Sequence, residues 1–249
     1  MKFIQRAFSF QFLPLILLIA GLPLLPAQTN NTLSKQERSS GWHLLFNGYS
    51  SAGWRGAYGP TFPKTGWLVE NGELKGNLSG GGQSADAGDI VTIRTYRDFD
   101  LKFDWKLDTG GNSGVKYFVE DDLPKPWGSA IGYEYQMIDD ANYIYEGKHL
   151  PQRLKTASIY DILAANKPDT TMNIWHTSRI RVYKNHITHW LDGKMVLDTD
   201  RSSSAFLEGL ASGKFKNDHG FATIPSGHIL LQDHGFPVAF RNIKIKELQ

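Results

Sequence analysis

The sequence of 249 residues contains no cysteine, and this absence removes several kinds of chemistry. Disulfide bonds, zinc sites built on thiolates and a cysteine nucleophile are all excluded. A lipid anchor attached through a cysteine is excluded for the same reason. The fold must therefore be held together by its own hydrophobic core.

The chain also lacks a strong net charge of either sign. Its formal net charge is +2, and the first 27 residues contain Lys2, Arg6 and no acidic residue, so their removal leaves a net charge of 0. Binding to nucleic acid requires a basic surface that neutralises phosphates. We therefore expect no nucleic-acid partner.

A long uninterrupted hydrophobic run is missing as well. The apolar run over residues 8–25 follows two positive charges and is interrupted by Pro14 and Pro23. This layout predicts a secretory signal peptide over residues 1–27 that is cleaved after Ala27, and the alternative is a retained N-terminal anchor. We expect a periplasmic or secreted protein with no membrane span after cleavage.

Helical periodicity is scarce, and its best candidate is the short stretch 155–165. Residues 28–40 are polar and predict a flexible leader, so the fold is expected to begin at residue 41 and to form one domain over 41–249. Within residues 100–107, every odd position is apolar and every even position is charged. This alternation is typical of an antiparallel strand with one face in the core.

Further strands are predicted on both sides of short turns. The Asn71-Gly72 and Asp192-Gly193 pairs favour tight hairpin turns, because their residues tolerate positive φ. The strands predicted around these and the Lys184-Asn185 turn are 66–70, 73–76, 179–183, 186–191 and 194–197, and a terminal strand follows over 238–245. With 25 Gly and 11 Pro as punctuation, the chain is predicted to be all-β, a two-sheet antiparallel sandwich.

Several segments, taken in order, carry a resemblance to one family. They are residues 42–48, 66–72, 88–92, 110–117, 132–136, 158–161, 189–193 and 232–246. The set resembles the 3-keto-disaccharide hydrolase family, which is also described as 3-keto-glucoside 1,2-lyase and 3-keto-2-hydroxy-glucal hydratase. The resemblance implies a concanavalin A-like jelly roll, as in lectins and glucanases, whose concave sheet holds a sugar.

The resemblance also implies a reaction on 3-keto glycosides or disaccharides. The C3 carbonyl of such a sugar acidifies the hydrogen on C2, so that the glycosidic oxygen on C1 can leave by β-elimination. The reaction needs a base for the C2 proton, an electrophile for the oxyanion at C3 and an acid for the departing oxygen. Addition of water to the unsaturated sugar then gives net hydrolysis.

Glu134 is the predicted base. Glu134 and Gln136 share one face of a predicted strand and lie about 6.6 Å apart by strand rise, whereas Tyr133, Tyr135 and Met137 share the other face. The tyrosines and Met137 are expected to enter the core, which turns Glu134 and Gln136 toward the cleft. The alternative is a glutamate on an ordinary solvated face.

Two further residues complete the predicted catalytic group. Residues 231–235 place an amide, an acid and an imidazole between apolar neighbours, a cluster that is costly to bury and is typical of a cleft. His234 in this cluster is predicted to act as acid or base. Lys116 follows the glycine-rich stretch 110–114 and is predicted to stabilise the C3 oxyanion, and a surface lysine is the alternative.

Six residues are predicted to bind substrate. They are Gln136, Asn112, Asp161, His189, Gln232 and Trp127, of which Trp127 lies in a proline-flanked loop. For His189 the alternative is a histidine that is hydrogen-bonded inside the packing. A divalent metal is chemically possible on carboxylates and His234, but no spacing in the sequence fixes such a site.

Two other functions compete with this hypothesis. A two-carboxylate glycosidase is suggested by the pattern Glu134-x-Gln136-x-x-Asp139, but the middle residue is an amide and Asp139 is expected on the opposite strand face. A noncatalytic carbohydrate-binding module would need the sandwich and its aromatic rings but no base.

Overall fold

The computed structural model describes residues 29–76, 88–121, 130–218, 220–221 and 223–249. The predicted signal peptide over residues 1–27 and the predicted ligand Trp127 lie outside these ranges. Within the described residues, no helix is both long enough and apolar enough to cross a membrane.

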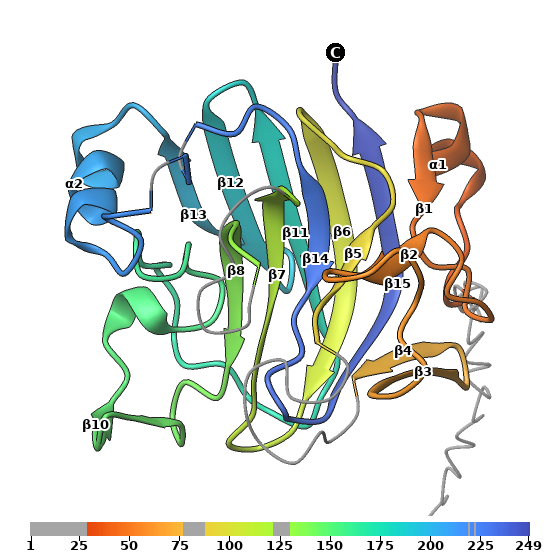
Figure 1. Ribbon diagram of the computed structural model, residues 1–249, viewed down its shortest axis with the longest axis horizontal. Helices are drawn as coiled ribbons and strands as arrows, with labels where there is room; N and C mark the ends of the chain where they lie inside the picture. Colours follow the sequence, from red (N-terminus) through yellow and green to blue (C-terminus); the bar gives the residue numbers. More distant parts are fainter. Residues whose placement is uncertain (1–28, 77–87, 122–129, 219, 222) are drawn as a thin grey trace, which may run out of the picture.

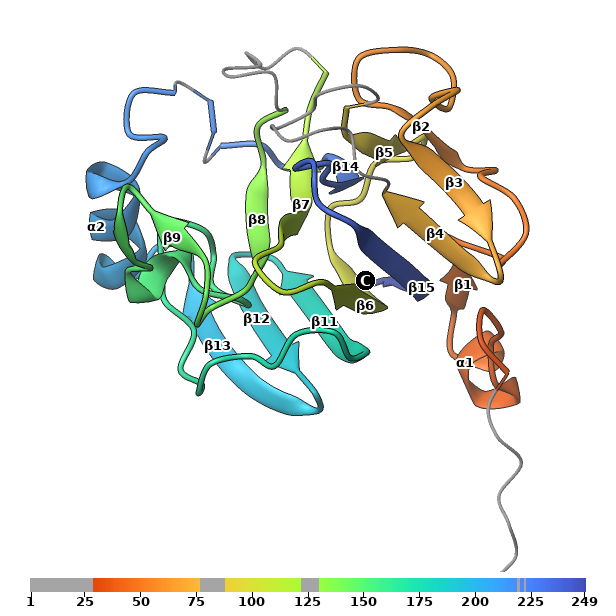
Figure 2. The same cartoon turned by 90° about the horizontal axis from the view of Figure 1, so that it is seen from below.

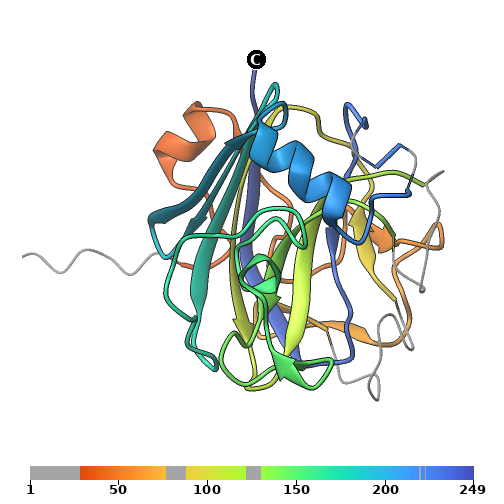
Figure 3. The ribbon, with the colours of Figure 1, turned by 90° about the vertical axis from the view of Figure 1, so that its left-hand side faces the viewer.

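Two antiparallel sheets form the body of the protein, and Figure 3 shows them side by side as two layers. The larger sheet has the order β13-β12-β11-β6-β15-β4-β3, with β1 paired to β15. Its strands are β1 Trp42–Leu44, β3 Trp67–Glu70, β4 Glu73–Gly76, β6 Phe99–Leu107, β11 His176–Tyr183, β12 His186–Leu191, β13 Lys194–Asp200 and β15 Val238–Glu247.

The smaller sheet lies in front of the larger one in Figure 1 and has the order β2-β5-β14-β7-β8. Its strands are β2 Trp54–Gly56, β5 Ile90–Thr92, β7 Asn112–Val119, β8 Tyr133–Ile138 and β14 His228–Leu231. The predicted all-β, two-sheet antiparallel sandwich is therefore confirmed. The strands predicted from alternation and from the turns are present as β3, β4, β6, β11, β12, β13 and β15.

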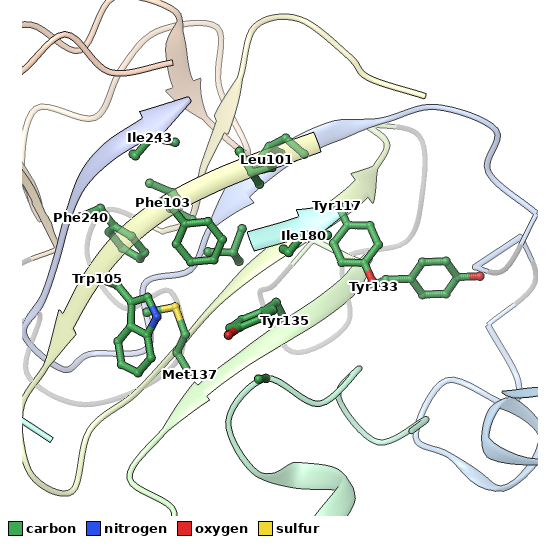
Figure 4. Packing of buried hydrophobic residues seen from close by; sticks show 14 of the residues in the cluster. Leu101, Phe103, Trp105, Tyr117, Tyr133, Tyr135, Met137, Ile180, Phe240 and Ile243 are labelled. Carbon is green, nitrogen blue, oxygen red and sulfur yellow. The ribbon is translucent and has the colours of Figure 1, made fainter. Parts of the chain in front are cut away.

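The core lies between the two sheets. Phe103 and Trp105 enter it from β6, and Tyr133, Tyr135 and Met137 enter it from β8 (Figure 4). The face of β8 predicted to enter the core is thus the one that does. Burial of these large side chains supplies the main stabilisation that a chain without disulfides requires.

The helices differ from the sequence prediction. Residues 155–165 are not helical, because their backbone pairs with β8: Ala157 N donates to Gln136 O at 2.8 Å, and Tyr160 N donates to Glu134 O at 2.9 Å. The main helix is instead α2, Ser204–Ser212, which lies on the β8 side of the molecule (Figure 2).

The segment between residues 29 and 40 is also more ordered than the predicted flexible leader. It contains α1, Lys35–Ser39, with a capping box between Ser34 and Glu37. Asn31 is 7% exposed, and its backbone N and side-chain Nδ2 donate to Asn242 Oδ1 and Gly72 O. These contacts fix the segment to the larger sheet, since Asn242 belongs to β15.

Candidate functional site

The candidate site is built on the face of β7 and β8 that is turned away from the main core. In the register of these strands Gly114 lies opposite Gln136, and Lys116 lies opposite Glu134. Side chains of directly opposite residues share one face of a sheet. The predicted base, amide and ammonium therefore come together.

Glu134 and Lys116 form a buried pair. Glu134 Oε2 lies 3.8 Å from Lys116 Nζ, and the two side chains are 7% and 4% exposed. Lys116 Nζ also donates to the carbonyl oxygen of Ala130 at 3.0 Å. The ammonium is thus held beside the carboxylate by two partners.

Burial is the largest influence on Glu134, and it raises the pKa of the carboxyl above its ordinary value. Lys116 and Lys214 oppose this rise because their positive charges favour the carboxylate, whereas Asp89 adds to it. The result is a carboxylate of raised basicity with cations around it, which suits a general base.

Gly114 allows the Glu134 side chain to lie across β7. A Cβ built at Gly114 would lie 2.6 Å from Glu134 Oε1 and 3.0 Å from its Cδ. Any side chain at this position would therefore displace the carboxylate. The requirement for glycine here is one of close approach and not of backbone conformation.

The segment after β14 brings the predicted cluster of residues 231–235 to the same strand. Gln232 N donates to Gly114 O at 3.0 Å, and Ser113 Oγ donates to Gln232 O at 2.9 Å. Beyond it, Asp233 N donates to Asp89 Oδ1 at 2.9 Å. These bonds extend the pairing of β14 with β7 and end it beside Asn112.

His234 is placed by Asn112. Asn112 Nδ2 lies 3.3 Å from His234 Nε2, and with the amide in this orientation Nε2 accepts and the ring proton sits on Nδ1. Burial lowers the pKa of His234, and the charges of Lys116 and Lys214 lower it further. The lowered pKa favours the neutral imidazole, which in this orientation carries its N–H on Nδ1.

Three buried polar atoms of this group have no hydrogen-bond partner within the described part of the protein. They are Asn112 Oδ1, Gln232 Oε1 and His234 Nδ1. Buried polar atoms are normally paired, so several unpaired ones in one place indicate a ligand-binding site. Asn112 and Gln232 are therefore well placed for the predicted role in substrate binding.

Gln136 lies on the same face but is already engaged. It is 2% exposed, and its Oε1 accepts from Met137 N at 2.9 Å. We assign it to the wall of the site.

The sequence prediction missed Lys214. Lys214 N donates to Asp161 Oδ2 at 2.6 Å, while Asp161 Oδ1 lies 2.7 Å from Arg153 Nε. Both oxygens of Asp161 are thus occupied, and the predicted substrate ligand instead holds the segment that carries Lys214. The charge of Lys214 acts on both Glu134 and His234. No local motif marks Lys214, because it reaches the site through long-range contacts.

His189 does not belong to the site, and its predicted role in substrate binding is corrected. It is 0% exposed, its Nδ1 lies 2.8 Å from Ala157 O, and its Nε2 lies 3.1 Å from the hydroxyl of Tyr117. His189 is therefore a hydrogen-bonded histidine inside the core, between the sheets.

Asp139 does not complete a two-carboxylate site. Its oxygens accept from the backbone N of Gly110, Ala141 and Asn142, at 2.8, 3.2 and 3.1 Å. This carboxylate closes the loop after β8, which agrees with the expectation that it leaves the Glu134 face. No group of three histidine or acidic side chains suited to a metal ion occurs within the described ranges.

Comparison with known proteins gives consistent results. A family model described as 3-keto-alpha-glucoside-1,2-lyase-like domain matches residues 41–246. The chain is 30% identical over 245 residues to a protein of Bacteroides thetaiotaomicron named 3-keto-disaccharide hydrolase, and this match covers 90% of the chain and 84% of that protein.

Two crystal structures of proteins from Parabacteroides distasonis, provisionally described as glycosyl hydrolases, are also similar. The first has a TM-score of 0.77 and 31% identity and covers 89% of this chain and 100% of its own. The second has a TM-score of 0.62 and 27% identity, and it covers 83% of this chain and 99% of its own. The family match spans most of the sandwich, so the chain belongs to the family of 3-keto-α-glucoside-1,2-lyase-like domains.

Proposed function

We propose that the protein is a carbohydrate-active enzyme that cleaves 3-keto glycosides or 3-keto disaccharides by β-elimination and then adds water. The buried pair of Glu134 and Lys116 beside His234 is the observation that carries this proposal. Family membership supports it, as does the similarity to a protein named 3-keto-disaccharide hydrolase.

Glu134 acts as the base in this proposal. It removes the hydrogen on C2, which the C3 carbonyl makes acidic. Burial raises the pKa of Glu134 and so strengthens it as a base, and the nearby cations favour its carboxylate form. A solvated carboxylate with an ordinary pKa would be a weaker proton acceptor.

Lys116 stabilises the charge that leaves Glu134. As the proton moves, negative charge passes from the carboxylate to the oxygen at C3. An ammonium 3.8 Å from the carboxylate is close to the charge both before and after this transfer. Inside a buried site such an interaction is stronger than in water.

Glu134 also supplies the proton for the departing oxygen. It passes the proton taken from C2 to the glycosidic oxygen as the C1–O bond breaks and the C1–C2 double bond forms, and His234 Nδ1–H donates a hydrogen bond to that oxygen. In the second step Glu134 takes a proton from water, whose hydroxide adds to C1, and then returns this proton to C2. The sum of both steps is hydrolysis, and both side chains return to their starting states.

The test compares Glu134→Gln with the matched surface variant Glu208→Gln, whose side chain is exposed on α2. A 3-keto glucoside is supplied, and enone absorbance and released aglycone are followed. We expect a loss of about 10²-fold or more for Glu134→Gln, typical of general base removal, and wild-type rates for Glu208→Gln. A binding module would bind the sugar with no turnover in any variant, and that result would refute the proposal.

We also propose that the protein is exported. The support is the signal-like pattern of residues 1–27. N-terminal sequencing of the protein from its native host is expected to begin at Gln28. A chain that retains Met1 in the cytoplasmic fraction would contradict export.

A further inference from the structure

Three partly buried aromatic rings lie next to the candidate site and have no role in the steps proposed above. They are Tyr143, Tyr160 and Phe236, which we call the aromatic wall. Tyr143 and Tyr160 pack against a small cluster of Ile138, Leu150 and Leu154, separate from the main core.

The aromatic wall is on the same side of the sheet as the reacting groups. Ile138, on which two of its rings pack, is two positions from Gln136 and four from Glu134 along β8, so all three share one face. The backbone N of Tyr160 donates to Glu134 O at 2.9 Å. One side of the wall is therefore tied directly to the strand that carries the base.

The other side of the wall continues from the imidazole. The ring centroids of His234 and Phe236 are 6.3 Å apart, with planes 27° from parallel. Phe236 in turn meets Tyr143 edge to face, with centroids 6.3 Å apart. The aromatic wall thus begins at His234, the group that donates a hydrogen bond to the departing oxygen.

The site face of β7 runs from Lys116 to the residue that holds His234. Lys116, Gly114 and Asn112 follow one another on the site face, and Asn112 holds His234. Four residues of strand span about 13 Å between Lys116 and Asn112. With the reacting sugar beside Glu134 and Lys116, as the proposed function requires, the group attached to its C1 extends toward His234 and Phe236.

We propose that the aromatic wall is the subsite for the leaving group and that it selects leaving groups with a flat apolar face. Such a face is offered by the C–H surface of a second pyranose ring or by an aromatic aglycone, and aromatic side chains stack on both. This inference rests on the proposed function, because it assumes a leaving group at C1.

The test uses three 3-keto glucosides that differ only in the leaving group: methyl, phenyl and glucosyl. For each substrate, kcat/KM of a variant is divided by that of the wild type, so that intrinsic differences between leaving groups cancel. The variants are Tyr143→Ala, Tyr143→Phe and Phe236→Leu. The control is Tyr183→Ala, a half-buried tyrosine at the end of β11 in the other sheet.

For Tyr143→Ala and Phe236→Leu we expect kcat/KM to fall about five- to tenfold on the phenyl and glucosyl substrates and to stay unchanged on the methyl substrate. Tyr143→Phe retains the ring and is expected to keep the phenyl and glucosyl activity. Tyr183→Ala is expected to affect no substrate. If only the glucosyl substrate is affected, the subsite binds a second sugar ring. If only the phenyl substrate is affected, it binds an aromatic aglycone.

Equal losses on all three substrates, or none, overturn the inference. A second measurement uses the wild type alone, so that it does not depend on whether a variant folds. KM for the methyl substrate is expected to be higher than for the other two substrates. Equal KM values would contradict the role of the aromatic wall as the leaving-group subsite. If the wild type turns over none of the three substrates, it is the proposed function that has failed.

Discussion

At the scale of single residues, the site depends on how closely side chains approach one another. Gly114 is the clearest case, since the Glu134 carboxylate lies where a Cβ at this position would be. The alternation of β8 predicted the direction of Glu134 correctly. The sequence could not show that a glycine on the neighbouring strand makes room for it, because the register between strands is a long-range property.

Gly114→Ala should therefore impair catalysis more than stability. The Cβ would meet the flexible end of Glu134, 2.6 Å from Oε1, so the carboxylate moves while the strand stays paired. A displacement of about 1 Å at a reacting group can lower kcat about 10²-fold. Gly59→Ala is the matched control, because nothing lies within 4 Å of its Cβ position. Equal kcat for both variants would show that the Glu134 carboxylate need not lie over Gly114.

At the scale of elements, periodicity predicted strands such as β6, in which one face meets water, but did not predict β7 and β14, which are buried on both faces. It did predict β8, which is also buried on both faces, because polar and apolar side chains alternate along it. In β6 charged and apolar residues alternate, and the strand was found. The helix α2 was missed because it spans only 9 residues. On β12 the sequence could not tell whether His189 enters the core or faces the other side of the sheet, because neighbouring strand residues alternate between the two faces. The partners that settle this, Ala157 and Tyr117, come from other elements.

The buried His189 predicts how stability depends on pH. Burial lowers the pKa of His189 from 6.5 to about 4, so the unfolded chain binds a proton more readily than the folded one between these values. Its stabilising effect is complete above pH 6.5 and is lost as the pH falls toward 4. Between pH 6.5 and pH 4 this histidine lowers the free energy of unfolding by about 3 kcal/mol.

The measurement is urea unfolding of wild type and His189→Gln at several pH values. As the pH falls from 6.5 to 4, the free energy of unfolding of the wild type should decrease by about 3 kcal/mol more than that of the variant. Parallel pH profiles would mean that the imidazole titrates equally in the folded and unfolded chains.

At the scale of the whole molecule, the site and the fold draw on distant parts of the chain. The site joins residues near positions 112, 134, 214 and 234, and the sequence identified three of these regions through its motifs and the family resemblance. Lys214 was missed because it is positioned through Asp161 from a different segment. The hydrogen bonds that fix residues 29–34 to β15 were also missed, because these polar residues resemble a solvated leader.

Substitution of Asn31 tests whether these contacts stabilise the fold. Asn31→Ala removes the Oδ1 acceptor of Asn242 N, at 2.8 Å, and the Nδ2 donor to Gly72 O, at 2.8 Å, and it places alanine at a φ of 57°. The lost bonds and the left-handed backbone should lower the free energy of unfolding by about 2 to 4 kcal/mol. Gln36→Ala, at an exposed position in the same segment, should change it by less than about 0.5 kcal/mol. Equal effects in urea titration would show that residues 29–34 do not stabilise the sandwich.

The most direct test of the account is a kinetic isotope effect at C2 of the sugar. If Glu134 removes the C2 proton during elimination, kcat/KM for a 3-keto glucoside carrying deuterium at C2 will be severalfold lower than for the protium substrate. Equal rates for the two substrates, together with cleavage of the parent unoxidised glucoside, would show that the C2–H bond stays intact and that an ordinary glycosidase mechanism operates.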